Sequence, residues 1–585
     1  MPENSVNFIV IDLFKHIHIL ILNFFKMKKN IFFIFLLYVS FVSGQKLKDS
    51  VKTEVIEVTR SFEPKVQDAY KININPQINP LPEKKIPVEF KIQSVPVAST
   101  FQPEKGAMAG FNPGSLIEKT YKNYAALAVG NYWQVQADAF LYYPLSQGLS
   151  AGLLFQHYSS QGQKSENILY EPFYNTALTG LFDYQNEQNL WHFELGYDGH
   201  LNYLKQDPNI ILLNPPQIYS LKNTDNNFHL LINGQFKETI FKNMLLHYNN
   251  YWNGFDNSEH LIHFKTFLLF PFGTLGLKIG IQSDLVTGNT GHIAFADPAI
   301  RYALNYNNAD IGLLPAIRLK NDHLTANLGA KIFYQNNVSF NRFQFIPDIK
   351  VNLNLIYEKL SVFTGVTGDL TQNSQFDLTR KNPYLALTQS LCPSLTPYDI
   401  FGGFNGAFSS SFSYAVTMGY RYIKQKAFYN YKPVNMPVGS YDIVYDNLAQ
   451  SYFKTAFNIG VGKKLDLKLN LTYFQNNPDH LKKALFIPDF DFQSVFIFHP
   501  TNRLSFDMTL NSAGKRFFQD GNDNYLKAYT DLNIGVRYKV NKQFTGFLKA
   551  YNVLNRNYQI YYLYPVQRLQ ILGGVAYRFD FPPKN

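Results

Sequence analysis

The sequence predicts an all-β protein built around one large, transmembrane, antiparallel β-barrel, and three observations lead to this prediction. Apolar and polar residues alternate along most of the chain after residue 115, as they do in strands with two different faces. Charged residues make up only 17% of the chain and aromatic residues 16%. The mean hydropathy of −0.19 is too polar for a bundle of membrane helices. This combination is typical of a barrel that is apolar outside and polar inside.

Alternation is clearest at 465–473, 503–511 and 529–539. In the first segment every second residue is apolar or aromatic, from Leu465 to Tyr473, and the residues between them are polar. Short turns at 462–464, 499–502 and 540–543 recur about every 40 residues, and long polar connections lie between them. Alternating short turns and long loops are characteristic of membrane barrels. We expect 18–22 strands, with 22 as the preferred number. The segment 297–324 can be divided into two strands or three.

The chain before the predicted barrel (115–585) divides into three parts. Residues 27–44 have the order of a signal peptide: Lys28 and Lys29, an apolar core, and small residues before Gln45. Residues 1–26 are expected to be a misassigned translation start, although one long signal anchor over 1–44 is the alternative. Residues 45–114 are rich in proline, which disfavours long helices. They are expected to form an extended periplasmic or lumenal segment.

Charge and cysteine content exclude several functions. The formal net charge is +11, but the basic residues are scattered and no nucleic-acid-binding motif accompanies them, so no nucleic-acid partner is expected. The single cysteine, Cys392, excludes an internal disulfide framework.

The spacing of His200, His260 and His263 matches no metal site, and the acidic run 520–524 is expected to be a polar loop. No nucleophile elbow is present. We therefore expect no catalytic, cofactor-binding or metal-binding residues and no enzyme. The many aromatic residues at 427–433 and 557–565 are explained by an interfacial girdle. Some of them could instead stack on a flat ligand in the mouth of the barrel.

The last strand is expected to close the barrel by pairing with a first strand near 121–131. One face of this strand is predicted to contact outer-membrane lipid and the other face to line the lumen. Proline lacks the N–H that a ladder needs, so the strand should end by Phe581, before Pro582 and Pro583. The lipid-facing residues are Val575, Tyr577, Phe579 and Phe581, and the lumenal residues are Ala576, Arg578 and Asp580.

Residues 529–559, with the motif NVLNRNY, and the closing GGVAYRF at 573–579 resemble the C-terminal end of TonB-dependent receptor barrels. This resemblance implies a barrel in the outer membrane of a Gram-negative bacterium, whose aromatic end is recognised by the barrel-assembly machinery. The family has a plug domain before its barrel. Only roughly 70 residues lie between Gln45 and Ser115, so a complete plug is not expected.

The run Thr53, Glu54, Val55, Ile56, Glu57 and Val58 is similar to the segment through which those receptors contact a periplasmic energy-coupling protein. An ordinary extended segment is the alternative. The chain is thus expected to take up or bind an unidentified solute across the outer membrane. The alternative is a structural or assembly barrel that docks partner proteins through its periplasmic segment and outer loops. In either case something should fill a lumen of this width, and residues 45–112 or a partner are candidates.

Overall fold

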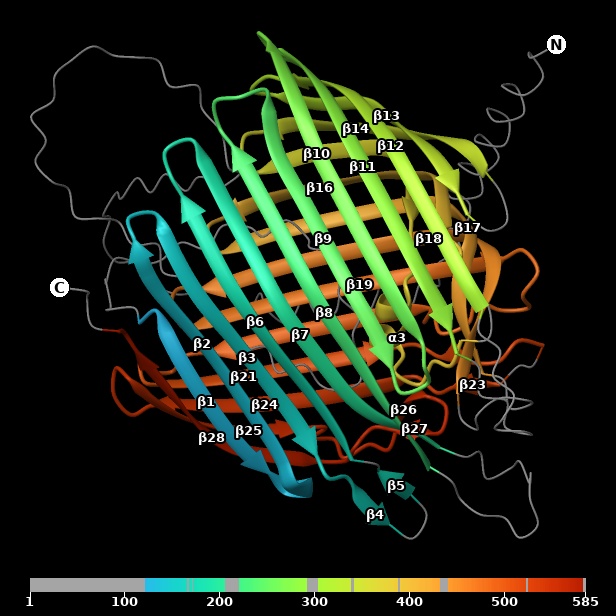
Figure 1. Ribbon diagram of the computed structural model, residues 1–585. Helices are drawn as coiled ribbons and strands as arrows, with labels where there is room; N and C mark the ends of the chain where they lie inside the picture. The colour runs from blue at the N-terminus through green and yellow to red at the C-terminus, as the bar shows by residue number, and fades with distance from the viewer. Residues whose placement is uncertain are drawn as a thin grey trace, which may run out of the picture. The chain divides into compact units, whose positions relative to one another are not determined.

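A closed antiparallel sheet of 22 strands forms the barrel in the computed structural model (Figure 1). The structure describes residues 121–165, 168–170, 172–205, 220–291, 304–337, 341–387, 390–431, 440–521 and 524–581. Each barrel strand pairs with the next one along the chain, and β1 (Asn123–Gly130) also pairs with β28 (Gln570–Phe579). The expected fold class and strand number are therefore confirmed. The predicted signal peptide, the proline-rich segment and Thr53–Val58 lie outside the described residues.

The other barrel strands differ in length, and some reach 17 residues or more. They are β2 (Gln134–Ser146), β3 (Leu149–Ser160), β6 (Phe173–Gln185), β7 (Asn189–Lys205), β8 (Ser220–Phe236), β9 (Phe241–Asn253), β10 (Ser258–Phe272), β11 (Leu275–Thr290), β12 (Leu304–Lys320), β13 (Leu324–Asn336), β14 (Asn341–Ile356), β15 (Leu360–Thr371), β16 (Ser394–Ser409), β17 (Phe412–Tyr431), β18 (Tyr441–Val461), β19 (Leu465–Pro478), β20 (Phe490–Phe498), β21 (Leu504–Ala513), β24 (Tyr529–Lys539) and β25 (Phe544–Tyr551).

Smaller elements lie in the connections. They are η1 (Asn131–Trp133), the hairpins β4 (Gln163–Ser165)–β5 (Ile168–Tyr170), β22 (Arg516–Phe517)–β23 (Tyr525–Leu526) and β26 (Gln559–Tyr561)–β27 (Tyr564–Pro565), and the helix α3 (Gln375–Lys381). No helix among the described residues is both long and apolar enough to span a membrane.

The two ends of the barrel are built differently. Short turns join β2 to β3, β18 to β19, β20 to β21 and β24 to β25, at the positions that the sequence predicted. We call this the turn end. Most connections at the opposite end, the loop end, are longer, such as those between β15 and β16 and between β25 and β28.

Of the stretch 297–324, which could be divided into two or three strands, the structure describes 304–324, and the long strand β12 takes up most of this part. Pro315 lies inside this strand, and the β12–β13 register omits it, passing from Leu313–Ile332 to Ala316–Gly329. Proline has no N–H to donate to the ladder, yet the pairing resumes on both sides. The ladder therefore skips Leu314 and Pro315 without ending the strand.

Side chains alternate between an apolar outer face and a polar lumen. On β1 the side chains of Leu127 and Val129 are 53% and 60% exposed, whereas Ala126 and Ala128 are buried on the other face. The same alternation places Val575 and Tyr577 of β28 on the outer face, next to β1. An outer face that is exposed and apolar is what lipid requires.

The closing strand is two residues shorter than predicted. β28 ends at Phe579, because the carboxylate of Asp580 accepts a hydrogen bond from the backbone N–H of Lys122 at 2.8 Å and takes the place of the next rung. Phe581 lies beyond the strand and packs edge-on against Tyr143, with ring centroids 5.6 Å apart. Phe579 contacts Phe581 in the same way at 5.5 Å.

We expect the replacement Phe579→Ala together with Phe581→Ala to impair membrane insertion, because it removes the aromatic end that packs beside the seam. Insertion is measured as the fraction of chain that migrates as a folded, heat-modifiable barrel in outer-membrane extracts. Truncation after Phe581 is the matched control and should insert normally. Normal insertion of the double variant would contradict the proposed role of these two residues.

Candidate functional site

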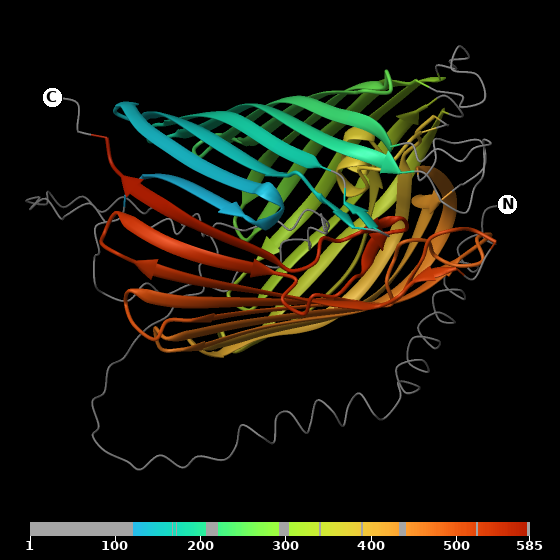
Figure 2. The same ribbon diagram turned by 90° about the horizontal axis from the view of Figure 1, so that it is seen from below.

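A long connection between β15 and β16 folds back into the ring of strands (Figures 1 and 2). We call residues 372–393 the strap, of which 372–387 and 390–393 are described. It contains α3 (Gln375–Lys381), which is preceded by the N-cap residue Ser374. The Ser374 hydroxyl accepts a hydrogen bond from the backbone N–H of Asp377 at 3.0 Å, and this cap satisfies one of the free N–H groups at the start of the helix.

A buried carboxylate on the barrel wall holds the start of the strap. Glu259 of β10 is 1% exposed and accepts hydrogen bonds from the backbone N–H of Gln375 at 2.7 Å and from the Tyr306 hydroxyl at 2.6 Å. A negative charge at a helix N-terminus is stabilised by the free N–H groups and by the helix dipole. A buried charge must be hydrogen-bonded in this way to be tolerated.

The far side of the strap is held by other parts of the barrel. The Tyr429 hydroxyl of β17 donates a hydrogen bond to the Leu378 carbonyl at 2.8 Å, and the Tyr561 hydroxyl of the 552–569 loop donates to the Lys381 carbonyl. β10 and β17 are separated by six intervening strands in the sheet. The strap therefore crosses the lumen and links walls that are not neighbours.

Aromatic side chains surround the strap at the loop end. Tyr384 stacks on Tyr564, with ring planes 11° apart, and Phe518 stacks on Tyr562 with ring centroids 4.4 Å apart. These residues belong to an apolar cluster formed by the strap, the ends of β17 and β18, and two loops. Its buried members include Leu378, Leu385, Leu391, Tyr431, Tyr441 and Phe518. A packed apolar cluster thus lies at the loop end. Because Tyr561, Tyr562 and Tyr564 lie in it, an interfacial girdle does not account for all of the aromatic residues.

A pocket of about 750 Å³ lies beside this cluster, between the loops 514–528 and 552–569. Its lining combines the aromatic rings of Tyr525 and Tyr558 with the cationic groups of Lys527 and Arg556. Small-molecule sites commonly have volumes of roughly 300–1,000 Å³ and a mixed apolar and polar lining. The pocket could accommodate a flat, negatively charged molecule.

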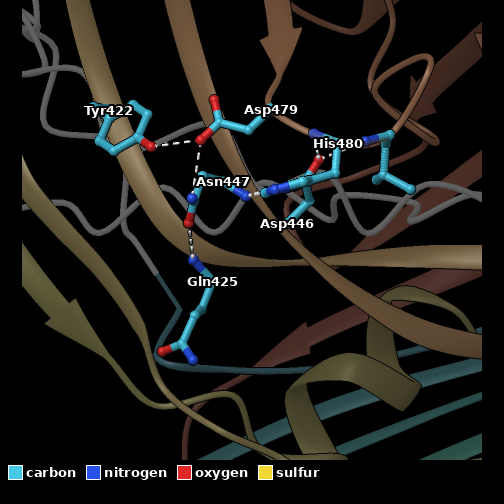
Figure 3. A network of polar contacts seen from close by, with 7 residues as sticks. Tyr422, Gln425, Asp446, Asn447, Asp479 and His480 are labelled. Atoms are coloured by element: carbon cyan, nitrogen blue, oxygen red, sulfur yellow. Dashed lines mark hydrogen bonds and ion pairs between the residues drawn. The ribbon is translucent and has the colours of Figure 1, made fainter.

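A polar network fixes another loop at this end (Figure 3). The Asp446 carboxylate of β18 accepts hydrogen bonds at 2.8 Å from the backbone N–H groups of His480 and Leu481 and from His480 Nδ1. Asp479 accepts from the Tyr422 hydroxyl at 2.7 Å and from the Asn447 amide at 2.9 Å. The loop 479–489 is therefore held in place mainly through carboxylates.

The same network reaches the root of the strap. Asn447 accepts a hydrogen bond from the backbone N–H of Gln425 at 3.1 Å. The Gln425 carbonyl in turn accepts one from the Ser394 hydroxyl at 2.6 Å. Gln425 has a φ of 52° and lies in a β-bulge between Ile423 and Lys426. Bulges often redirect a strand next to a functional site, and this one joins two loops.

The histidines noted in the sequence make ordinary wall contacts. His200 Nδ1 contacts Asn175 at 2.8 Å, His260 Nδ1 contacts the Tyr248 hydroxyl at 3.0 Å, and His263 pairs with Asp284. Across the described residues, no three His, Cys, Asp or Glu side chains form a set that could hold a metal ion.

Cys392 lies at the root of the strap, where its backbone N–H donates to the Tyr445 hydroxyl at 3.0 Å. Burial raises the pKa of its thiol to about 11.

The strap and its anchor, Glu259, were not predicted from the sequence. A helix of seven residues such as α3 is too short to form a long amphipathic segment. The run Ser374-x-x-Asp377 was an available signal, because it resembles a helix-capping box. No local signal marks Glu259, whose helix partner Gln375 is 116 positions away.

Glu259→Gln should release the strap, because it removes the charge that accepts the helix N–H groups. Such hydrogen bonds contribute roughly 1.5–3 kcal/mol, so we expect a maleimide to label Cys392 about tenfold faster or more. The thiol is the single one in the chain, which makes the labelling rate specific. Glu187→Gln, in the exposed turn between β6 and β7, is the control. Equal rates in both variants would contradict anchoring by Glu259.

The loop 479–489 should be ordered more strongly at acidic pH. The hydrogen bond and the charge of Asp446 raise the pKa of His480 above its usual 6.5. Its protonated form therefore stabilises the fold fully below pH 6.5, and this contribution is lost as the pH rises through the higher folded-state value. Hydrogen-exchange protection of Leu481 should be greater at pH 5.5 than at pH 8.5. His480→Gln should abolish the difference; a difference that persists in this variant would exclude His480 as its source.

Comparison with known proteins gives matches at the level of structure. No family profile and no curated protein matches the sequence. The siderophore receptor PirA from Acinetobacter baumannii superposes with a TM-score of 0.59 at 11% identity, over 78% of this chain and 80% of that one. The FrpB iron transporter from Neisseria meningitidis has a TM-score of 0.59 at 11% identity, over 79% of this chain and 82% of that one. The pyoverdine receptor FpvA from Pseudomonas aeruginosa has a TM-score of 0.56 at 10% identity, over 78% of each chain.

At such low identity these similarities concern the fold. The names of all three proteins describe receptors or transporters. Each superposition covers more than three quarters of this chain. The closed sheet, the apolar outer face and the unequal ends all fit a Gram-negative outer-membrane protein. The chain has the fold of a TonB-dependent receptor barrel.

Proposed function

We propose that this chain binds a solute at its loop end and takes it up across the outer membrane. The pocket at the loop end is the observation that carries the proposal. A receptor needs a binding pocket at its mouth, and the loops 514–528 and 552–569 line one. The structurally similar proteins act on iron or siderophores by description, and this supports uptake by fold-level analogy.

An iron-loaded siderophore is the solute class that we propose. Its size suits a pocket of about 750 Å³, and tyrosine rings beside Lys527 and Arg556 suit a flat anionic chelate through stacking and charge. Nothing in the fold favours the assembly role over uptake.

Residues 45–112 are proposed to make uptake selective, by filling the lumen or by engaging a periplasmic energy-coupling protein through Thr53–Val58. Their deletion should abolish accumulation of ⁵⁵Fe supplied as a catecholate siderophore in cells that depend on this chain. The purified deletion variant should also conduct more ions than the full chain in planar bilayers, because the lumen loses its occupant.

A variant with Lys527→Gln and Arg556→Gln separates binding from passage. It should lose siderophore binding but retain the conductance of the full chain. If cells with and without the chain accumulate ⁵⁵Fe equally, uptake of this solute class is excluded. If the deletion leaves conductance unchanged, residues 45–112 do not fill the lumen.

A further inference from the structure

A group of positively charged side chains lies on the lumen wall between the strap and the turn end. Lys265, Lys278 and Arg318 come from the consecutive strands β10, β11 and β12. In the register, Lys278 is opposite Leu269 and Arg318 is opposite Gly276, so the three positions follow a diagonal toward the turn end. Their sequence neighbours Leu277 and Ile317 are exposed on the outer face, which directs the cations into the lumen.

Two of these cations lie close to the same aromatic ring. The ammonium of Lys278 lies 3.8 Å from the centroid of the Phe267 ring, and that of Lys265 lies 5.5 Å from it. Gly280 is opposite Phe267, and a Cβ there would come within 2.7 Å of the ring. The glycine therefore lets the ring lie against the wall, where its face attracts the lysines.

The nearby carboxylates are paired with other groups. Asp369 accepts from Lys331 at 3.0 Å, Asp348 lies 3.6 Å from Lys350, and Asp284 pairs with His263. Among the described residues, no carboxylate lies within 4 Å of the charged groups of Lys265, Lys278 or Arg318. Asp348 is close enough to attract Lys278, but Lys265, Arg318 and Lys350 are also close enough for their charges to repel it.

Isolated lysines on a barrel wall need no special explanation, since they extend toward water. Three on adjoining strands are different, because Lys278 is close enough to Lys265 and Arg318 for their charges to repel it. A group of side chains in which positive charges outnumber negative ones, inside a low-dielectric shell, also concentrates anions. Repulsion among the three cations therefore lowers the free energy of unfolding in the absence of an anion. A bound anion offsets this repulsion and raises the free energy of unfolding.

We propose that Lys265, Lys278 and Arg318 form a binding site for multiply charged oxyanions of the phosphate class. The guanidinium of Arg318 supplies a planar pair of donors that matches two oxyanion oxygens. The two ammonium groups supply point charges on the other side. The site is separate from the pocket at the loop end and does not depend on the identity of the imported solute.

The test uses the purified full chain in detergent, with inorganic pyrophosphate as the probe. Lysine acetylation is followed by mass spectrometry with pyrophosphate or with sodium chloride of equal ionic strength. Pyrophosphate should slow the modification of Lys265 and Lys278 at least threefold. It should leave Lys542, in the turn 540–543, unchanged. Arg318→Gln should weaken the protection. Equal protection at Lys542, or none at the two wall lysines, would overturn the proposal.

Thermal unfolding gives a second readout that a purely structural role would not produce. Lys278→Gln should unfold at a higher temperature than the natural chain without anion, because one repelling charge is gone. It should also lose the stabilisation by pyrophosphate. Lys542→Gln is the control for both effects. A destabilised Lys278→Gln that still responds to pyrophosphate would refute the site. Protection by polyglutamate but not by pyrophosphate would refute it in favour of an acidic protein partner.

Discussion

Closure of the sheet between β1 and β28 is the constraint on which the rest of the structure depends. Lipid offers no partner for a backbone N–H or C=O, so an open sheet edge is not tolerated there. The seam is close-packed: Ala126 faces Ala576 and Ala128 faces Gly574. A Cβ on Gly574 would lie 2.5 Å from the Leu127 carbonyl oxygen. Small residues at the seam thus allow the first and last strands to approach.

Closure also decides where irregular backbone can exist. The strap has only one helical element, of seven residues, and its remaining polar groups need partners. Inside the ring they find Glu259, Tyr429 and Tyr561, which come from distant parts of the chain. A segment of this kind could not lie on the lipid face, where its carbonyls and N–H groups would have no partner. The position of the strap inside the ring is therefore a consequence of the closed sheet.

The period-two pattern was sufficient to predict the barrel, because each strand has one face in lipid and one in the lumen. Recurrent short turns then led to the strand number. Local patterns were weaker where a single residue decided the outcome. The stretch 297–324 allowed two strands or three, yet the β12–β13 ladder skips Leu314 and Pro315 and then resumes, so β12 continues through them. The last strand was predicted to reach Phe581, but the side chain of Asp580 ends the pairing at Phe579.

The contacts of the candidate site could not be predicted in the same way. Glu259 and Gln375 meet because the strap crosses the lumen, and Lys265, Lys278 and Arg318 meet because three strands have one particular register. Both depend on closure and pairing, which no local window of sequence contains. The aromatic residues at 557–565 illustrate the limit, since Tyr561 and Tyr562 pack in the apolar cluster at the mouth and do not serve the interfacial girdle alone.

The strap has a mechanical consequence for the wall. A closed sheet resists stretching along its ladders, whereas its cross-section can flatten by small rotations between strands. A segment fixed to β10 at one end and to β17 at the other acts as a transverse strut and sets the width of the mouth along that line. Release of the strap would therefore let the cross-section of the barrel rim change shape. A change at one loop would then alter the positions of strands that do not contact that loop.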